Sequence, residues 1–410
     1  MEVSSNGAVI LHRERAAQTY RWELVRGGSS GVLEACWQAF ALLVAIRYFG
    51  AGDGIKPFIV AGTGVGLTLS FFTLPSILRL RLAVAAALAL IWGVAGTALL
   101  GSALAPGFAV FFFGVFVAQV FTAQGPQLIA HVYATNFPAS ERGSRLSMAL
   151  VVSAVAGIVF SYAGGTVLDA DLAYYRWVFG AAGVAALVGA FAFWRIPSEP
   201  LSSITRSRLM ENLSLAWRDR TFGWLLAGWM LIGLGNLMII PLRVEYLANP
   251  AYGLDLANAE ATALLVGVVA AFRIVSTRIW GAIFDRLDLI TVRVCLNLFF
   301  FASILIFFNS TSLIGLFVGS ALLGVAFGGG GIMWALFVTK IAPAQKVPAY
   351  MSLHGFLTGI RMAAAPFVGY GLLALGGPVF AAWCAALLIA LSTILFIPLR
   401  SRLTPPEDVR

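Results

Sequence analysis

The chain is built from apolar stretches of about 20 residues, which short polar segments separate along its whole length. A helix of that length rises about 30 Å and so crosses the hydrocarbon core of a bilayer. Hydrophobic residues make up 60% of the 410 residues and charged residues 11%, which departs from the usual composition of soluble domains. We therefore predict an all-α membrane protein.

The boundaries of these stretches predict twelve transmembrane helices. They are expected at residues 30–49, 56–75, 82–101, 107–133, 144–167, 174–194, 222–247, 259–281, 290–308, 312–338, 350–374 and 378–397. The longest polar stretch between helices divides the chain into two halves of six. The expected domains are an N-terminal bundle with its N-tail (1–195), a linker (196–220) and a C-terminal bundle with its C-tail (221–410).

The distribution of charge predicts how the chain lies in the membrane. The formal net charge is +9, but the basic residues are spread over short loops instead of forming the single patch of a nucleic-acid-binding protein. Most of them fall on the side that both termini share, whereas the loops of the other side carry several acidic residues. Basic loops favour the cytoplasmic side, so we expect a multi-pass protein of a bacterial inner membrane with both termini in the cytoplasm.

Two pairs of residues relate the halves to each other. Pro138 follows the fourth predicted helix as Pro343 follows the tenth, and the same offset of half a chain relates Gly125 to Gly330. Internal repeats of this kind occur in many transporters. The two halves are therefore expected to be pseudo-symmetric.

A short motif follows the eighth predicted helix. Residues 281–286 read Gly-Ala-Ile-Phe-Asp-Arg, and Arg293 follows seven residues after Arg286. This resembles the signature loop of the major facilitator superfamily, Gly-x-x-x-Asp-Arg followed by a further basic residue, and residues 137–143 are similar to that family's loop between helices four and five. The resemblance implies two six-helix bundles around a midplane cavity. It also implies gating roles for Asp285, Arg286, Arg293 and Arg142.

Charged residues inside the predicted helices are the main candidates for a substrate site, because a charge at bilayer depth costs at least about 2.5–3.5 kcal/mol on insertion scales. Glu34 and Gln38 lie one helical turn apart in the first helix and are expected to line the cavity, with Glu34 carrying a coupled proton. Arg273 and Arg361 are expected near the midplane, where guanidinium groups could hold a carboxylate or phosphate. Alternatively, each arginine pairs structurally with Glu34 or with backbone carbonyls.

Uncharged polar side chains give softer candidates in the fourth, seventh and tenth helices. The substrate-binding candidates of this kind are Gln119, Gln124, Asn236 and Trp334. Amides also bridge packed membrane helices, so a role as interhelical contacts stays open for each. Arg243 and Glu245, near the outer end of the seventh helix, are expected to reach the interface by snorkelling and to act as gate or boundary residues.

These residues favour one function and leave two others open. The leading prediction is a secondary active transporter that works by alternating access as a monomer, moves a small organic anion and is coupled to protons. The alternatives are an exporter of amphiphilic or drug-like compounds and a non-transporting receptor on the same scaffold. An enzyme is not expected, because the three histidines are scattered and the three cysteines lie singly in apolar runs. For the same reason no metal site or cofactor is expected, and the partners would be the substrate, a proton and membrane lipid.

Overall fold

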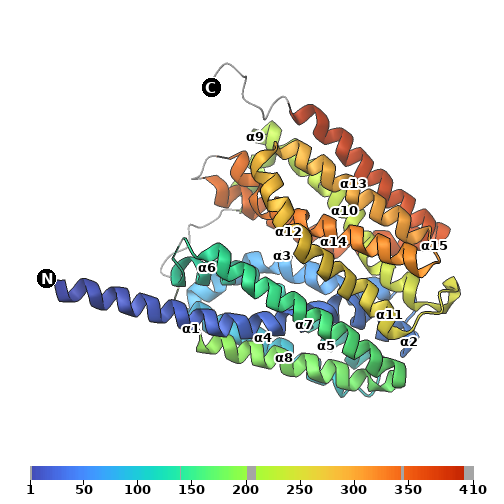
Figure 1. The fold of residues 1–410 in the computed structure, drawn as a ribbon, viewed down its shortest axis with the longest axis horizontal. Coiled ribbons are helices and arrows are strands. Elements are labelled where there is room, and N and C mark those ends of the chain that lie inside the picture. The colour runs from blue at the N-terminus through green and yellow to red at the C-terminus, as the bar shows by residue number, and fades with distance from the viewer. Residues whose placement is uncertain (1, 139, 201–208, 343–345, 401–410) are drawn as a thin grey trace.

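The computed structural model describes residues 2–138, 140–200, 209–342 and 346–400, and these residues fold almost wholly into helices (Figure 1). Pro343 of the proposed repeat and part of the predicted linker, residues 201–208, lie outside the described residues. Helix α8 ends at Arg195 and helix α10 begins at Arg220, at the same end of the molecule. We call this end the linker face. The other end is called the opposite face.

The first half of the chain forms the helices that are blue to green in Figure 1. They are α1 (Glu2–Ala35), α2 (Ala41–Arg47), α3 (Lys56–Leu80), α4 (Val84–Ala103), α5 (Phe108–Thr122), α6 (Pro126–Asn136), α7 (Arg142–Ala170) and α8 (Tyr175–Arg195). A π-helix, Cys36–Phe40, joins α1 to α2, so that the three segments form one continuous helix. The predicted helix 107–133 is instead two helices, because Pro126 at the first position of α6 has no backbone N–H to continue α5.

The second half forms the helices from yellow-green to red. They are α9 (Leu209–Arg218), α10 (Arg220–Ala248), α11 (Asn258–Thr262), α12 (Val269–Arg286), α13 (Leu289–Phe308), α14 (Leu313–Leu336) and α15 (Val347–Phe396). A second π-helix, Ala263–Val268, joins α11 to α12.

The segment α15 is two spans that turn back on each other. Gly377 interrupts it with a φ of 77°, in the left-handed region that glycine adopts without strain. A straight helix would carry Phe396 about 40 Å beyond Gly369. Instead, Gly369 lies against Met238 of α10, and Phe396 lies against Gly228, nearer the start of the same helix. The chain therefore reverses at Gly377, between the eleventh and twelfth predicted helices.

Among the described residues, nine helices are long and apolar enough to cross a membrane. One of the nine contains both spans of α15. Helix α3, with 25 residues, and the consecutive pair α5 and α6 supply the remaining spans. The twelve-helix membrane fold is thus confirmed.

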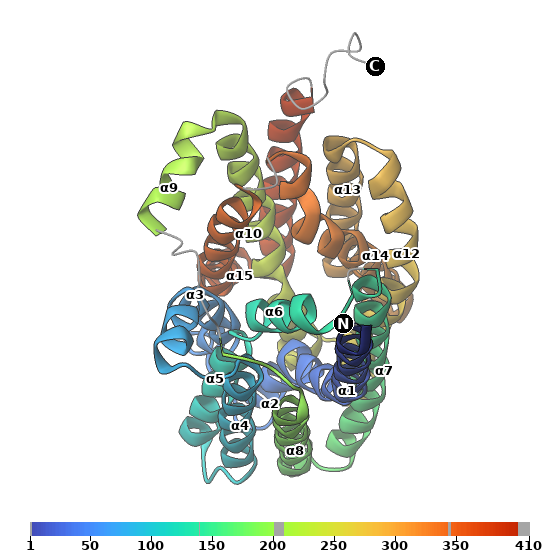
Figure 2. The same cartoon turned by 90° about the vertical axis from the view of Figure 1, so that its left-hand side faces the viewer.

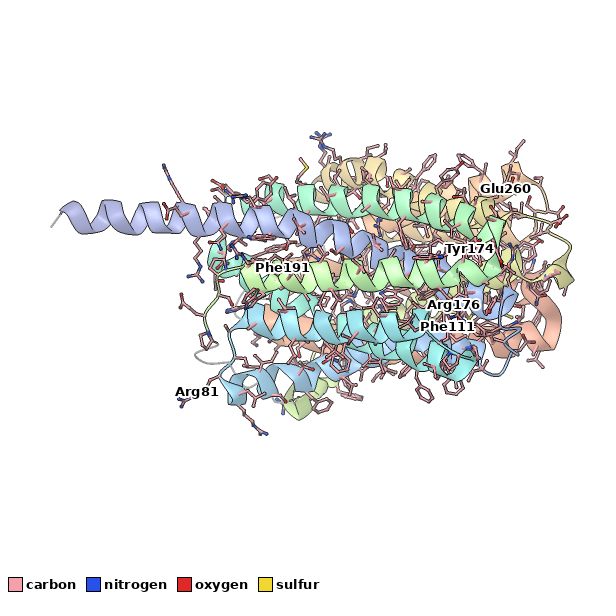
Figure 3. All side chains as sticks on the ribbon, turned by 90° about the horizontal axis from the view of Figure 1, so that it is seen from below. Arg81, Phe111, Tyr174, Arg176, Phe191 and Glu260 are labelled. Atoms are coloured by element: carbon pink, nitrogen blue, oxygen red, sulfur yellow. The ribbon has the colours of Figure 1, made fainter. Side chains whose placement is uncertain are left out.

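The helix that contains the first span begins earlier than the predicted span. It starts at Glu2, and its N-terminal part projects beyond the other helices (Figures 1 and 3). The charged residues that suggested a later start are buried as a pair, with Arg26 Nη2 2.5 Å from Glu23 Oε1. The hydroxyl of Tyr133 donates to the same carboxylate. Pairing of opposite charges allows these residues to be buried within the bundle, and the hydropathy of the sequence does not reveal such pairs.

The helices form two bundles with matching internal contacts (Figure 2). In the first bundle α1 packs on α7 and α4 on α8, and in the second α10 and α13 both pack on α15. The bundles lie close together at the opposite face, near α2 and α11, and diverge toward the linker face (Figure 1). Figure 3 marks these ends by Arg81 at the linker face and Glu260 at the opposite face.

Candidate functional site

A cavity of about 290 Å³ lies between the two bundles. Helices of both bundles line it, including α3 and α5 of the first and α10, α14 and α15 of the second. Its wall is mostly apolar, with Trp37, Ile240, Leu265 and Phe327 among the larger side chains. Of the described residues that line it, only Glu34 and Arg243 are charged. This central cavity is the candidate substrate site.

An ion pair crosses from one bundle to the other beside the cavity. Arg273 Nη1 donates to Glu34 Oε1 at 2.7 Å, and its Nη2 lies 3.3 Å from Oε2. Gln38 Nε2 donates to the same Oε1 at 2.8 Å. Both charged side chains keep about a third of their surface exposed, at 34% for Glu34 and 30% for Arg273. The predicted Glu34–Gln38 pair therefore lies at the cavity, and Arg273 is bound to Glu34 as the structural alternative expected.

The two π-helices lie next to this ion pair. Cys36–Phe40 begins just after Glu34 and presents Trp37 and Gln38 to the cavity, while Ala263–Val268 presents Leu265. The two segments contact each other across the bundles. A π turn widens the helix locally and changes the direction of its side chains, and such turns are frequent at functional sites.

Arg243 is the cationic residue of the cavity wall that sequence reasoning misplaced. It was expected to reach the interface, but it is 3% exposed, because the end of α10 from Pro241 to Ala248 is buried. Its Nη2 donates to Ser303 Oγ at 2.7 Å, and its guanidinium carbon lies 4.2 Å from the ring centre of Phe307. Its Nε and Nη1 are buried and have no hydrogen-bond partner among the described residues. The side chain thus lines an apolar cavity with two of its donors unpaired.

Met362 lines the central cavity, but its neighbour Arg361 is not among the described residues of the cavity wall. Arg361 Nη1 donates to the carbonyl of Trp229 at 2.5 Å, and Nη2 donates to Thr358 Oγ1 at 3.1 Å. Successive residues of a helix point about 100° apart, so Arg361 points away from the cavity that Met362 lines. The geometry therefore does not support the expected contact of Arg361 with the substrate. Bonding to a backbone carbonyl was the alternative.

The polar uncharged candidates are divided between cavity and packing. Gln119 lines the cavity and donates to the carbonyl of Ile59 at 2.6 Å. Gln124, in the turn after α5, donates to the carbonyl of Val120 at 3.0 Å, and Trp334 Nε1 donates to Thr358 Oγ1 at 3.3 Å. Asn236 is partly buried on α10. None of these last three is among the described residues of the cavity wall.

A second cavity, of about 460 Å³, continues from the central one within the first bundle. The two share Glu34, Trp37 and Thr63, and the second extends to Arg26 and Tyr133. Arg26 precedes Glu34 by two helical turns toward the linker face. Glu34 therefore borders both the central cavity and the space on its linker side.

Comparisons with known proteins place the fold. No family model and no curated protein matches the sequence. Among solved structures, the nucleoside transporter NupG superposes with a TM-score of 0.72 at 10% identity, covering 96% of this chain and 100% of that chain. A peptide transporter POT in complex with sulfate gives 0.72 at 13%, covering 96% of both chains, and a D-xylose-proton symporter gives 0.68 at 14%, covering 93% and 96%. The chain has the major facilitator superfamily fold.

In this major facilitator fold the opposite face is closed by contacts between the bundles. Lys56 Nζ lies 2.8 Å from Glu245 Oε1, and both side chains are buried. Arg47 donates to the carbonyls of Leu247, Ala248 and Leu256 at 3.0–3.1 Å. Glu245 was expected as a gate or boundary residue that reaches the interface by snorkelling, but its side chain is buried in this contact.

The predicted gating residues make no such closure at the linker face. Asp285 and Arg286 are exposed. Arg142 donates to the carbonyls of Phe137 and Ala134 in its own bundle, at 3.0 and 2.6 Å. Arg293 is buried within the second bundle. The described contacts thus close the opposite face and leave these four residues outside any bridge between bundles.

Proposed function

We propose that this chain is a secondary active transporter that carries a small organic anion across a bacterial inner membrane by alternating access, coupled to protons. The fold supports transport in general, and its neighbours are named as nucleoside, peptide and D-xylose-proton transporters. The basic loops favour a cytoplasmic linker face, so the described state is inward-facing. The moving bodies are residues 1–195 and 221–410 of one monomer, joined by the linker 196–220.

The free guanidinium of Arg243 is the observation that carries the anion assignment. Arginine keeps its proton in proteins, and a buried charge requires a partner. Its unpaired Nε and Nη1, both buried in this state, would supply two donors for a carboxylate once the side chain turns toward the cavity. Arg243 thus takes the role that the sequence suggested for Arg361, and the apolar wall accommodates an apolar body of the substrate.

Glu34 is the proposed proton carrier. Its carboxylate holds Arg273 across the bundles and faces two connected cavities. Protonation would remove the charge that attracts Arg273, which weakens one link between the bundles. Proton binding and the conformational change are thereby coupled at Glu34.

Thermal unfolding of the purified protein tests the ligand class. The panel contains aliphatic and aromatic carboxylates, sugars and amphiphilic cations, with Arg243→Gln and the exposed-residue control Arg278→Gln beside the parent. Carboxylates should raise the melting temperature of the parent and of Arg278→Gln but not of Arg243→Gln. Arg243→Gln should fold, because it removes an unpaired buried charge. Equal stabilisation of all three proteins would contradict the anion site.

An exporter of amphiphilic compounds is the second candidate. The mostly apolar wall of the central cavity, with Trp37 and Phe327, favours it. That function predicts stabilisation by many unrelated amphiphiles and little dependence on Arg243. If no ligand produces flux in proteoliposomes, a receptor on the transporter scaffold becomes the better proposal.

A further inference from the structure

A group of buried basic residues lies inside the second bundle, away from the central cavity. Arg293 of α13 and Arg361 and His354 of α15 are 2%, 6% and 1% exposed. Both guanidinium carbons lie over the same indole ring, that of Trp229, at 4.9 and 6.0 Å from its centre. The ring of His354 lies 5.1 Å from that indole. Three basic groups are thus gathered around one tryptophan.

The hydrogen bonds of this group leave donors free. Arg293 Nε donates to Asn297 Oδ1 at 2.8 Å, but its Nη2 has no partner among the described residues. Within the same part of the chain, Arg361 Nε and His354 Nε2 also lack a partner, although Arg361 uses its other two nitrogens. In the part of the chain that the structure describes, no carboxylate pairs with either arginine.

Two buried guanidinium groups without a counter-charge are unfavourable. Both guanidinium carbons lie within 6.0 Å of the centre of the Trp229 ring, and like charges at such a separation in a buried site repel each other. Arginine does not relieve this by losing its proton. The aromatic faces of Trp229 and Phe300 offset part of the charge but do not neutralise it. A bound anion would neutralise the charge and use the free donors.

We propose that Arg293, Arg361 and His354 form a buried site for a small inorganic monoanion of the size of chloride. Trp229, Trp334 and Phe337 surround the ring of His354 at 4.7–5.6 Å, so the site is enclosed by aromatic walls. The aromatic enclosure favours a small anion over a large organic one. The anion acts as a fixed counter-ion that joins α13 to α15, and the site stands whether or not the chain transports carboxylates.

Thermal unfolding of the full chain in detergent, with chloride replaced by gluconate at constant ionic strength, tests this site. Chloride and bromide should raise the melting temperature saturably by about 2–4 °C, and the bulkier gluconate should not. Arg293→Met and Arg361→Met should each abolish the dependence. Arg278→Gln, at an exposed position on α12, should retain it.

Two results overturn the proposal: equal melting temperatures in chloride and gluconate, or a chloride effect that Arg243→Gln abolishes and Arg361→Met does not. If the methionine variants fail to fold, crystals of the parent grown in bromide decide. An anomalous peak within about 3.5 Å of the Arg293 and Arg361 nitrogens is expected. Its absence from this position contradicts the site.

Discussion

Lys56 Nζ lies 2.8 Å from Glu245 Oε1 and joins α3 of the first bundle to α10 of the second. Their side chains are 4% and 1% exposed. Tyr370 and Asn249 also donate to this carboxylate, at 3.2 and 2.6 Å. This buried group of contacts closes the opposite face, so an alternating-access cycle must break and re-form it.

Glu245→Gln should weaken that closure. Removing one partner of a buried ion pair costs about 3–5 kcal/mol, so the population should shift toward the state open at the opposite face. A cysteine at Thr63 in the cavity wall, in a background without the three native cysteines, should then react faster with an impermeant reagent from that side.

The matched control for this change is Asp53→Asn. Asp53 pairs with the same Lys56 at 2.7 Å, but its side chain is 65% exposed. Its loss should cost no more than about 1 kcal/mol, with little change in labelling. Equal labelling rates in the two variants would show that burial of the Lys56–Glu245 pair does not control the opening.

Gly359→Ala should disturb the contact between the bundles. An added Cβ would lie 2.7 Å from the backbone nitrogen of Thr68 on α3, so one helix must move, at a cost of about 1–3 kcal/mol. Gly355, one turn earlier on the same helix, has nothing within 4 Å of its added Cβ. Gly355→Ala should instead stabilise the helix by up to about 1 kcal/mol. Melting temperatures that move in opposite directions are expected, and parallel shifts would contradict this packing.

Glu34→Gln should separate transport from the proton gradient. The amide cannot exchange a proton but can still hydrogen-bond to Gln38, so substrate exchange should persist while uptake driven by a pH gradient is lost. The control is Glu260→Gln, at an exposed position on α11. Proteoliposome assays of exchange and of gradient-driven uptake measure the two activities. Retained gradient-driven uptake in Glu34→Gln would exclude this residue as the proton carrier.

The helices could be read from the sequence because apolar length and helix breakers are local properties. Gly377 and the following Pro378 separate the last two spans, as expected. The pairing of Glu34 with Gln38 follows from helical spacing alone. Such features depend on neighbours in the chain and need no knowledge of tertiary contacts.

The roles of the arginines could not be read in this way. Arg361 and Met362 are adjacent, yet only Met362 is among the described residues of the cavity wall, because side-chain direction depends on how the helix is rotated in its bundle. Arg243 looked able to reach the interface, but its guanidinium is buried against Ser303 and Phe307 of α13 in its own bundle. Local sequence specifies neither the rotation of a helix in its bundle nor which helices pack over its end.

Uptake of a labelled carboxylate, chosen from the compounds that stabilise the parent, into proteoliposomes with an imposed pH gradient is the most direct test of anion transport. The parent should accumulate it. Arg243→Gln should bind it about 10- to 150-fold more weakly, because hydrogen bonds to charged groups contribute about 1.5–3 kcal/mol. Arg278→Gln should behave like the parent. Equal uptake by Arg243→Gln and the parent at low substrate concentration would contradict the central proposal.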